Sequence, residues 1–72
     1  MPESRASRTL AAWCAANTQM ALVLRIEALT GRRIRQSTVS RWITGDRLPM
    51  PRFVALLADE LGIPPQHWYL AP

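Results

Sequence analysis

Cysteine and histidine are almost absent from this chain, which has Cys14 as its only cysteine and His67 as its only histidine. A lone thiol cannot form an internal disulfide, and one thiol with one imidazole is too few ligands for a structural zinc site. A chain of about 60 residues buries only roughly 60% of its extended surface, so 72 residues lie near the lower limit for an independent core. The fold must therefore rest on apolar packing, in which we expect Cys14 to act as a small apolar side chain.

Long hydrophobic runs are also missing. No apolar stretch reaches the roughly 18 to 20 residues that cross a bilayer. The opening, Met-Pro-Glu-Ser-Arg-Ala-Ser-Arg, lacks the apolar core of a signal peptide. We therefore expect no membrane association and a cytoplasmic location.

Catalytic groups are equally scarce. The sequence has no Gly-rich phosphate loop, no catalytic pair of carboxylates and no serine–histidine or cysteine–histidine set. His67 has no second ligand nearby and is interpreted as a solvated residue of the C-terminal tail, residues 63–72. The sequence thus predicts no enzyme, no cofactor, no metal and no small-molecule substrate.

Lysine is absent, and the positive charge is unevenly placed. Nine arginines against five acidic residues give a formal net charge of +4. Between residues 32 and 52, six arginines stand against Asp46 alone, a balance of +5, and the rest of the chain is nearly neutral. Such a local concentration predicts a polyanion as partner. Guanidinium suits that partner, because its planar fork binds phosphate or guanine through paired hydrogen bonds.

What is present is a helical pattern along nearly the whole chain. Apolar residues recur three and four positions apart, and these segments are separated by residues that start or stop helices. Ser7 and Thr18 are candidate N-caps, and Gly31, Gly45 and Gly62 are candidate stops. The pattern predicts an all-α, compact bundle of four to five helices in a single domain, residues 1–72, with helices over 7–16, 19–30, 36–44 and 51–61 and one further turn after Pro65.

The third of these helices has an unusual outer face. Val39 and Trp42 lie three apart and face inward, so we assign Trp42 to the core. The outward set combines amide, hydroxyl and guanidinium groups without a carboxylate: Gln36, Ser37, Ser40, Arg41 and Thr44. Such groups suit the edges of bases, and the short serines allow close approach to a groove. An ordinary surface helix would show the same periodicity, so these residues alone leave both interpretations open.

Three segments stand in a characteristic order: Thr18-Gln19-Met20-Ala21-Leu22, then Ser37-Thr38-Val39-Ser40-Arg41-Trp42 with Gly45 and Pro49, then Leu57-Ala58-Asp59-Glu60-Leu61-Gly62-Ile63. Together they resemble the phage repressor and Cro type of helix-turn-helix regulator, which includes short Cro-like antitoxin and prophage regulators. The resemblance covers about residues 9–63, with the helix-turn-helix over about 18–45. It implies a lambda-repressor-like bundle whose second helix lies across the DNA backbone and whose third enters the major groove.

The resemblance also implies roles for individual residues. Those that fall where the family contacts bases are Gln36, Ser37 and Arg41, with Ser40 beside them. Gln19 matches a family glutamine that binds phosphate and braces the start of the third helix. The other candidate phosphate-binding residues are Arg32, Arg33, Arg35, Thr44, Arg47 and Arg52.

One departure from the family concerns the spacing from Leu22 to Ile34, which is about six residues longer than usual. The insertion, roughly residues 27–33, either lengthens the second helix or enlarges the turn after it. Which of these occurs stays open here, and so does the face of the third helix that reaches bases. The insertion would bring Arg32 and Arg33 over a phosphate strand, a contact that shorter members lack.

We therefore expect a transcriptional repressor of phage or bacterial type that binds double-stranded DNA as a homodimer and is associated with the nucleoid. The alternative is an antitoxin-like or adaptor module that holds a protein partner with its tail. Trp68, Tyr69 and Leu70 are the candidate residues for a dimer or partner interface. For Trp68 a place in the core is favoured over that role.

Overall fold

A computed structural model describes residues 3–72 of the chain. Four α-helices and a 3₁₀ turn follow one another: α1 (Arg5–Asn17), α2 (Gln19–Thr30), α3 (Gln36–Thr44), α4 (Pro51–Leu61) and η1 (Pro65–Tyr69). None of the described residues lies in a strand, and none of the described helices has the length and apolar character to cross a membrane. The predicted all-α architecture is confirmed: α2, α3 and α4 have the predicted bounds, and η1 is the further turn predicted after Pro65.

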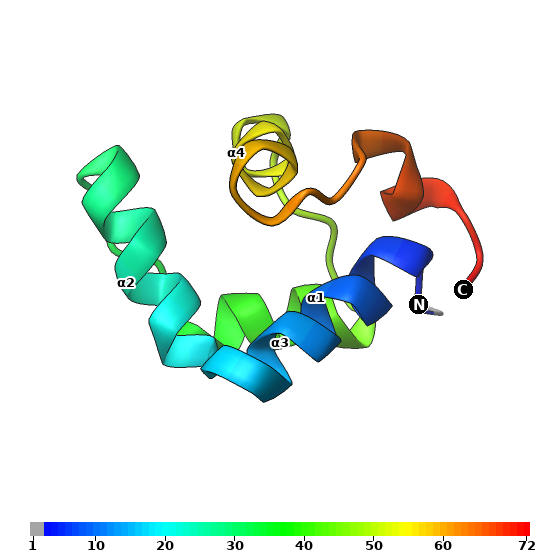
Figure 1. Cartoon of the computed structure of the whole chain (residues 1–72), viewed down its shortest axis with the longest axis horizontal. Coiled ribbons are helices and arrows are strands. Elements are labelled where there is room, and N and C mark those ends of the chain that lie inside the picture. Colours follow the sequence, from blue (N-terminus) through cyan, green and yellow to red (C-terminus); the bar gives the residue numbers. More distant parts are fainter. Residues whose placement is uncertain (1–2) are drawn as a thin grey trace.

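The helices are arranged around α1. α1 contacts α2, α3 and η1, while α2 contacts α3 and α4 contacts η1. Figure 1 shows α2 at one end of the long axis of the molecule, with η1 and both ends of the chain at the other. The backbone N–H of Arg5 donates to the carbonyl of Leu70 over 2.8 Å, which ties the start of α1 to the tail.

One apolar cluster holds these elements together. Its buried members include Leu10 of α1, Ile26 of α2, Trp42 of α3, Leu57 of α4 and Trp68 of η1. The ring centroids of Trp42 and Phe53 lie 5.5 Å apart and the rings are tilted by 45°. At this distance two aromatic rings attract each other. Trp42 is therefore a core residue, as its spacing from Val39 predicts, and α3 is fixed to the rest of the fold through it.

Cys14 also belongs to this cluster. Its thiol is buried, and the loss of solvent raises the pKa of the thiol above the ordinary value. A raised pKa keeps the group protonated and unreactive near neutral pH. Cys14 therefore packs as a small apolar side chain.

α1 begins earlier than predicted, because Ser7 is not its N-cap. Ser4 holds that position: its Oγ accepts from the backbone N–H of Ser7 over 3.0 Å, and its own N–H donates to the Oγ of Ser7 over 2.7 Å. This reciprocal pair is a capping box. The earlier serine is selected because it brings Ala6 into the buried cluster and Arg5 into contact with the tail.

α1 and α2 meet without a loop at Thr18. This residue has a φ of +84°, a conformation that is strained for a β-branched side chain. Its Oγ1 accepts from the backbone N–H of Ala21 over 3.1 Å, so Thr18 is the N-cap of α2, as predicted. The strain is thus partly offset by a cap, and the chain reverses sharply at this point.

The predicted insertion, residues 27–33, lies where α2 ends and the connector to α3, residues 31–35, begins. α2 continues to Thr30 and ends at Gly31, whose φ of +74° is left-handed. The hydroxyl of Thr30 donates to the carbonyl of Ile26 over 2.7 Å and accepts from the N–H of Arg32 over 3.2 Å. Ile34 packs against the core cluster. Of the predicted insertion, residues 27–33, the first part therefore lies in the last turn of α2 and the rest in the connector, which Thr30 braces.

The link from α3 to α4 follows the sequence pattern. Gly45, with a φ of +81°, ends α3, and the N–H groups of Gly45 and Asp46 donate to the carbonyls of Trp42 and Arg41. These two bonds form the hydrogen-bond pattern of a Schellman motif. Pro51 then occupies the first turn of α4, where its missing N–H costs nothing.

Candidate nucleic-acid interface

The outer face of α3 carries five of the candidate residues together. Val39 and Trp42 hold the inner face in the core. Ser37 and Arg41 lie four apart and form one row on the opposite side, and Ser40 and Thr44 form the adjacent row. Gln36 stands at the exposed N-terminal end of the helix, and of the five only Ser40 is half-buried. The face is therefore continuous, open to solvent and free of carboxylates.

The N-terminus of α3 lacks the side chains that usually stabilise the start of a helix. Its N-cap, Arg35, makes no side-chain capping bond, and its first turn has no acidic residue. A cation at this end opposes the helix dipole, so stability alone would favour a serine or an aspartate. The same arrangement of uncapped N–H groups and positive charge is favourable beside an anion.

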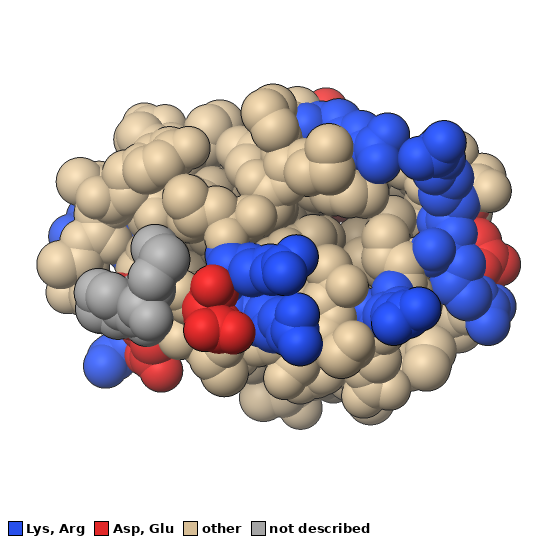
Figure 2. All heavy atoms as spheres, turned by 180° about the vertical axis from the view of Figure 1, so that it is seen from behind, with Lys and Arg blue, Asp and Glu red and all other residues tan. Residues whose placement is uncertain are grey.

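Exposed arginines precede and follow α3 along the chain, and one lies on α3 itself. Arg32, Arg33, Arg35, Arg41, Arg47 and Arg52 are all exposed, and we call them the arginine patch. Figure 2 shows arginine side chains spread over the face opposite to the view of Figure 1, with acidic side chains beside some of them. Within residues 3–72, only Arg33 of the patch has an ion-pair partner. The remaining members keep their charge available for an anionic ligand.

Two members of the patch are held by contacts with the protein. The guanidinium of Arg52 lies 5.0 Å from the ring centroid of Phe53, so its position is fixed by a cation–π contact. Arg33 donates through Nε and Nη2 to the two carboxylate oxygens of Glu27. These hydrogen bonds hold the pKa of the Glu27 carboxyl below its usual range. Glu27 was not among the residues that the sequence singled out.

Gln19 is the first residue of α2 and is half-buried. Its side chain makes no hydrogen bond within the part of the chain that the structure describes, so the brace to α3 that the family resemblance implies is not formed there. The amide of Gln19 therefore has no partner among the described residues, and its contact with phosphate stays a prediction.

The three candidate interface residues of the tail differ in how far they are buried. Trp68 is only 3% exposed, whereas Tyr69 is 77% exposed and Leu70 is also exposed. The indole N–H of Trp68 has no hydrogen-bond partner among the described residues. Trp68 therefore serves the core, and the outward-facing residues of the tail are Tyr69 and Leu70.

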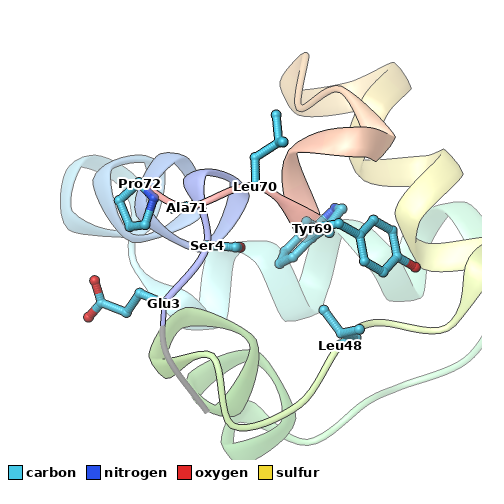
Figure 3. Close-up of a pocket in the computed structure, with 8 residues that line it drawn as sticks. Glu3, Ser4, Leu48, Tyr69, Leu70, Ala71 and Pro72 are labelled. Carbon is cyan, nitrogen blue, oxygen red and sulfur yellow. The ribbon is translucent and has the colours of Figure 1, made fainter.

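The link between α3 and α4 exposes two further apolar side chains, Leu48 and Met50. Leu48 lines the same hollow as Tyr69 and Leu70, and Met50 lies two residues further along the chain. We call these four residues the tail surface. That hollow, of about 340 Å³, is framed by the start of α1, by Leu48 and by the tail (Figure 3). A second hollow, of about 480 Å³, lies between Tyr69 and the first turn of α4. The sequence pattern did not identify Leu48 and Met50, because they lie in a connector without periodicity.

Histidine, cysteine and acidic side chains do not gather into a metal site in the described residues. No group of three such side chains there could hold a metal ion. Cys14 is buried apart from other ligands, and His67 stands alone in η1.

Comparison with known proteins gives one match. A family model described as Helix-turn-helix, of the Cro/C1 type, matches residues 24–68. The match covers more than half of the chain and includes all of α3 and α4, the whole arginine patch, and η1 except its last residue, Tyr69. It leaves α1 and Gln19 outside, although the resemblance seen in the sequence reaches both. No curated protein and no solved structure matches the chain.

Proposed function

The chain belongs to the Cro/C1-type helix-turn-helix family of DNA-binding regulators, and from this premise we propose that it is a sequence-specific transcriptional repressor that binds double-stranded DNA as a homodimer. The observation that carries the proposal is the outer face of α3, which is exposed, polar and without carboxylates. In this proposal α3 lies in the major groove, where each base pair presents a distinct set of donors and acceptors.

Sequence preference comes from the side chains of α3. Arg41 donates two hydrogen bonds to O6 and N7 of a guanine, and Gln36 pairs with N6 and N7 of an adenine. Each such pair is worth about 1 to 3 kcal/mol of discrimination against a wrong base. Ser37 and Ser40 bring the helix close to the groove and add single hydrogen bonds.

Affinity comes mainly from contacts with phosphates. Arg47 and Arg52 follow α3, and Arg32 and Arg35 precede it, so the arginine patch flanks α3 on both sides along the chain. Gln19 and Thr44 add neutral donors to the phosphates. Each phosphate that a cation neutralises releases counterions, so binding weakens as salt rises.

The tail surface supports a homodimer. Its four apolar side chains are exposed on a chain that is near the lower size limit for an independent core. The longest dimension of the chain is 31 Å, and two half-sites one helical turn apart are separated by about 34 Å. Two copies joined at their tail surfaces would therefore be of a size to reach two adjacent half-sites.

Selection of bound duplexes from a random library at near-physiological salt tests the proposal. Nonspecific attraction is screened under this condition, whereas contacts with base edges persist. We expect a palindromic motif whose two halves are one helical turn apart. Recovery of no motif would contradict sequence-specific binding, and recovery of a single half-site would contradict the dimer.

The tail surface also favours a second candidate function, in which the chain is an antitoxin-like or adaptor module that holds a different protein. Tyr69→Asp separates the two roles, because the residue is exposed and the substitution should leave the core intact. For a homodimer we expect the variant to sediment as a monomer and to keep binding half-sites weakly. An unchanged sedimentation coefficient, together with no selected motif, would instead favour the partner-binding role.

A further inference from the structure

The connector between α2 and α3 carries three arginines, and they do not stand in equivalent surroundings. Within residues 3–72, Arg32 and Arg35 have no acidic partner, whereas Arg33 is paired with Glu27 in the last turns of α2. What this difference means for DNA binding rests on the proposed function.

The geometry of the pair is that of an anion bound to a guanidinium. Nε of Arg33 donates to one oxygen of Glu27, and Nη2 donates to the other over 3.4 Å. A phosphate accepts two parallel hydrogen bonds from arginine in the same way. Glu27 therefore occupies the edge of Arg33 that a DNA phosphate would otherwise bind.

The pair is not needed to hold the connector in place. Gly31 turns the chain in its left-handed conformation, and the hydroxyl of Thr30 binds the backbone at Ile26 and Arg32. Ile34 then anchors the far end of the connector against the core. The side chains of Arg33 and Glu27 are 63% and 37% exposed, and an exposed pair of this kind adds little to stability.

We propose that Glu27 is an intramolecular competitor that limits the binding of the connector to DNA. Its carboxylate satisfies and neutralises Arg33, so the connector offers two phosphate-binding arginines, Arg32 and Arg35, instead of three. A phosphate that approached Arg33 would also meet the negative charge of Glu27. The effect is on phosphate attraction and is therefore the same for every base sequence.

Glu27→Gln tests this proposal, because it removes the charge and keeps the size of the side chain. We expect affinity to rise for all duplexes alike, by about fivefold at near-physiological salt, the gain expected from one additional phosphate contact. The slope of log K against log salt should become steeper by about 0.9. Both quantities come from one salt titration of a fixed duplex, repeated with a second duplex of unrelated sequence.

Three further variants serve as controls. Arg33→Gln alone should leave the slope unchanged, and added to Glu27→Gln it should return the slope to the wild-type value. Arg32→Gln should lower the slope by about 0.9 in either background. Glu60→Gln removes the same charge from the Arg25–Glu60 pair, 3.9 Å between its atoms and outside the connector, and should leave the slope unchanged.

Unchanged or weaker binding by Glu27→Gln would overturn the proposal, because Glu27 would then be neutral for binding or would position Arg33 on the phosphate. A lower slope for Arg33→Gln alone would overturn it as well. The wild-type titration is read first: if that chain binds no duplex, the proposed function fails and this inference fails with it. Wild-type binding with no response to Glu27→Gln overturns this inference only.

Discussion

α2 and α3 are consecutive helices that meet the core in the same way and meet the solvent differently. Both end at a left-handed glycine and both bury one face in the same apolar cluster. The outer face of α2 exposes Met20, Leu24 and Leu29, whereas that of α3 exposes amide, hydroxyl and guanidinium groups. Packing in the core therefore explains the residue types on the inner face of each helix, but it does not determine those on the outer face. The composition of an outer face is informative about what that face contacts.

Trp42→Ala should have the largest effect, because it removes a buried side chain from the inner face of α3 and leaves that of α2 unchanged. The substitution deletes a buried indole and its contact with Phe53, and we expect a loss of about 3 to 5 kcal/mol in the free energy of unfolding. For a domain of this size that is a large part of the total stability. Urea unfolding followed by circular dichroism measures it. A loss below about 1 kcal/mol would show that α3 is not fixed through Trp42.

Arg41→Ala should change the base preference of the outer face of α3 and leave its inner face intact. The residue is exposed, so stability should change little, while the preference at one base position should fall by about 1 to 3 kcal/mol. Arg47→Ala is the matched control, and should weaken all sequences alike with a salt slope lower by about 0.9. Competition titrations with single-base variants of the selected motif measure both. Equal weakening at every sequence by Arg41→Ala would contradict its assignment to base readout.

Leu24→Gln should have the smallest effect, because it changes only the outer face of α2. The two residues have similar helix propensity, and Leu24 is 48% exposed. We expect the free energy of unfolding to stay within about 0.5 kcal/mol of the wild type and DNA affinity to remain unchanged. Thermal melts and the same salt titration check this. A large loss of DNA affinity would show that α2 contributes this face to binding or assembly.

The bounds of α2, α3 and α4 could be predicted from the sequence because the signals that set them are local. Thr18 caps its own helix, and Gly31, Gly45 and Gly62 each adopt the conformation that ends one. The start of α1 could not be predicted in this way. Ser4 and Ser7 are equally good caps by residue type, and the choice between them depends on the contact of Arg5 with Leu70, which is distant in sequence.

Part of the candidate site was predictable for the same reason. A period of 3.6 residues places Ser37 and Arg41 opposite Val39 without knowledge of the rest of the fold. The pairing of Glu27 with Arg33 was not predictable, because the two are six residues apart and a helix ends between them. Periodicity carries no information across such a break. The burial of Trp68 beside an exposed Tyr69 likewise depends on how the tail folds back onto α1.

The hydrogen bond between Arg5 and Leu70 has a consequence for anything attached to this chain. It brings the beginning and the end of the fold together, and Figure 1 shows both at the end of the molecule remote from α2. A fluorophore, affinity tag or fused domain at either terminus would emerge beside the tail surface. In the proposed dimer, the starts of both α1 helices and both tails would lie near the symmetry axis. Labels intended to leave assembly undisturbed therefore belong on the exposed side of α2.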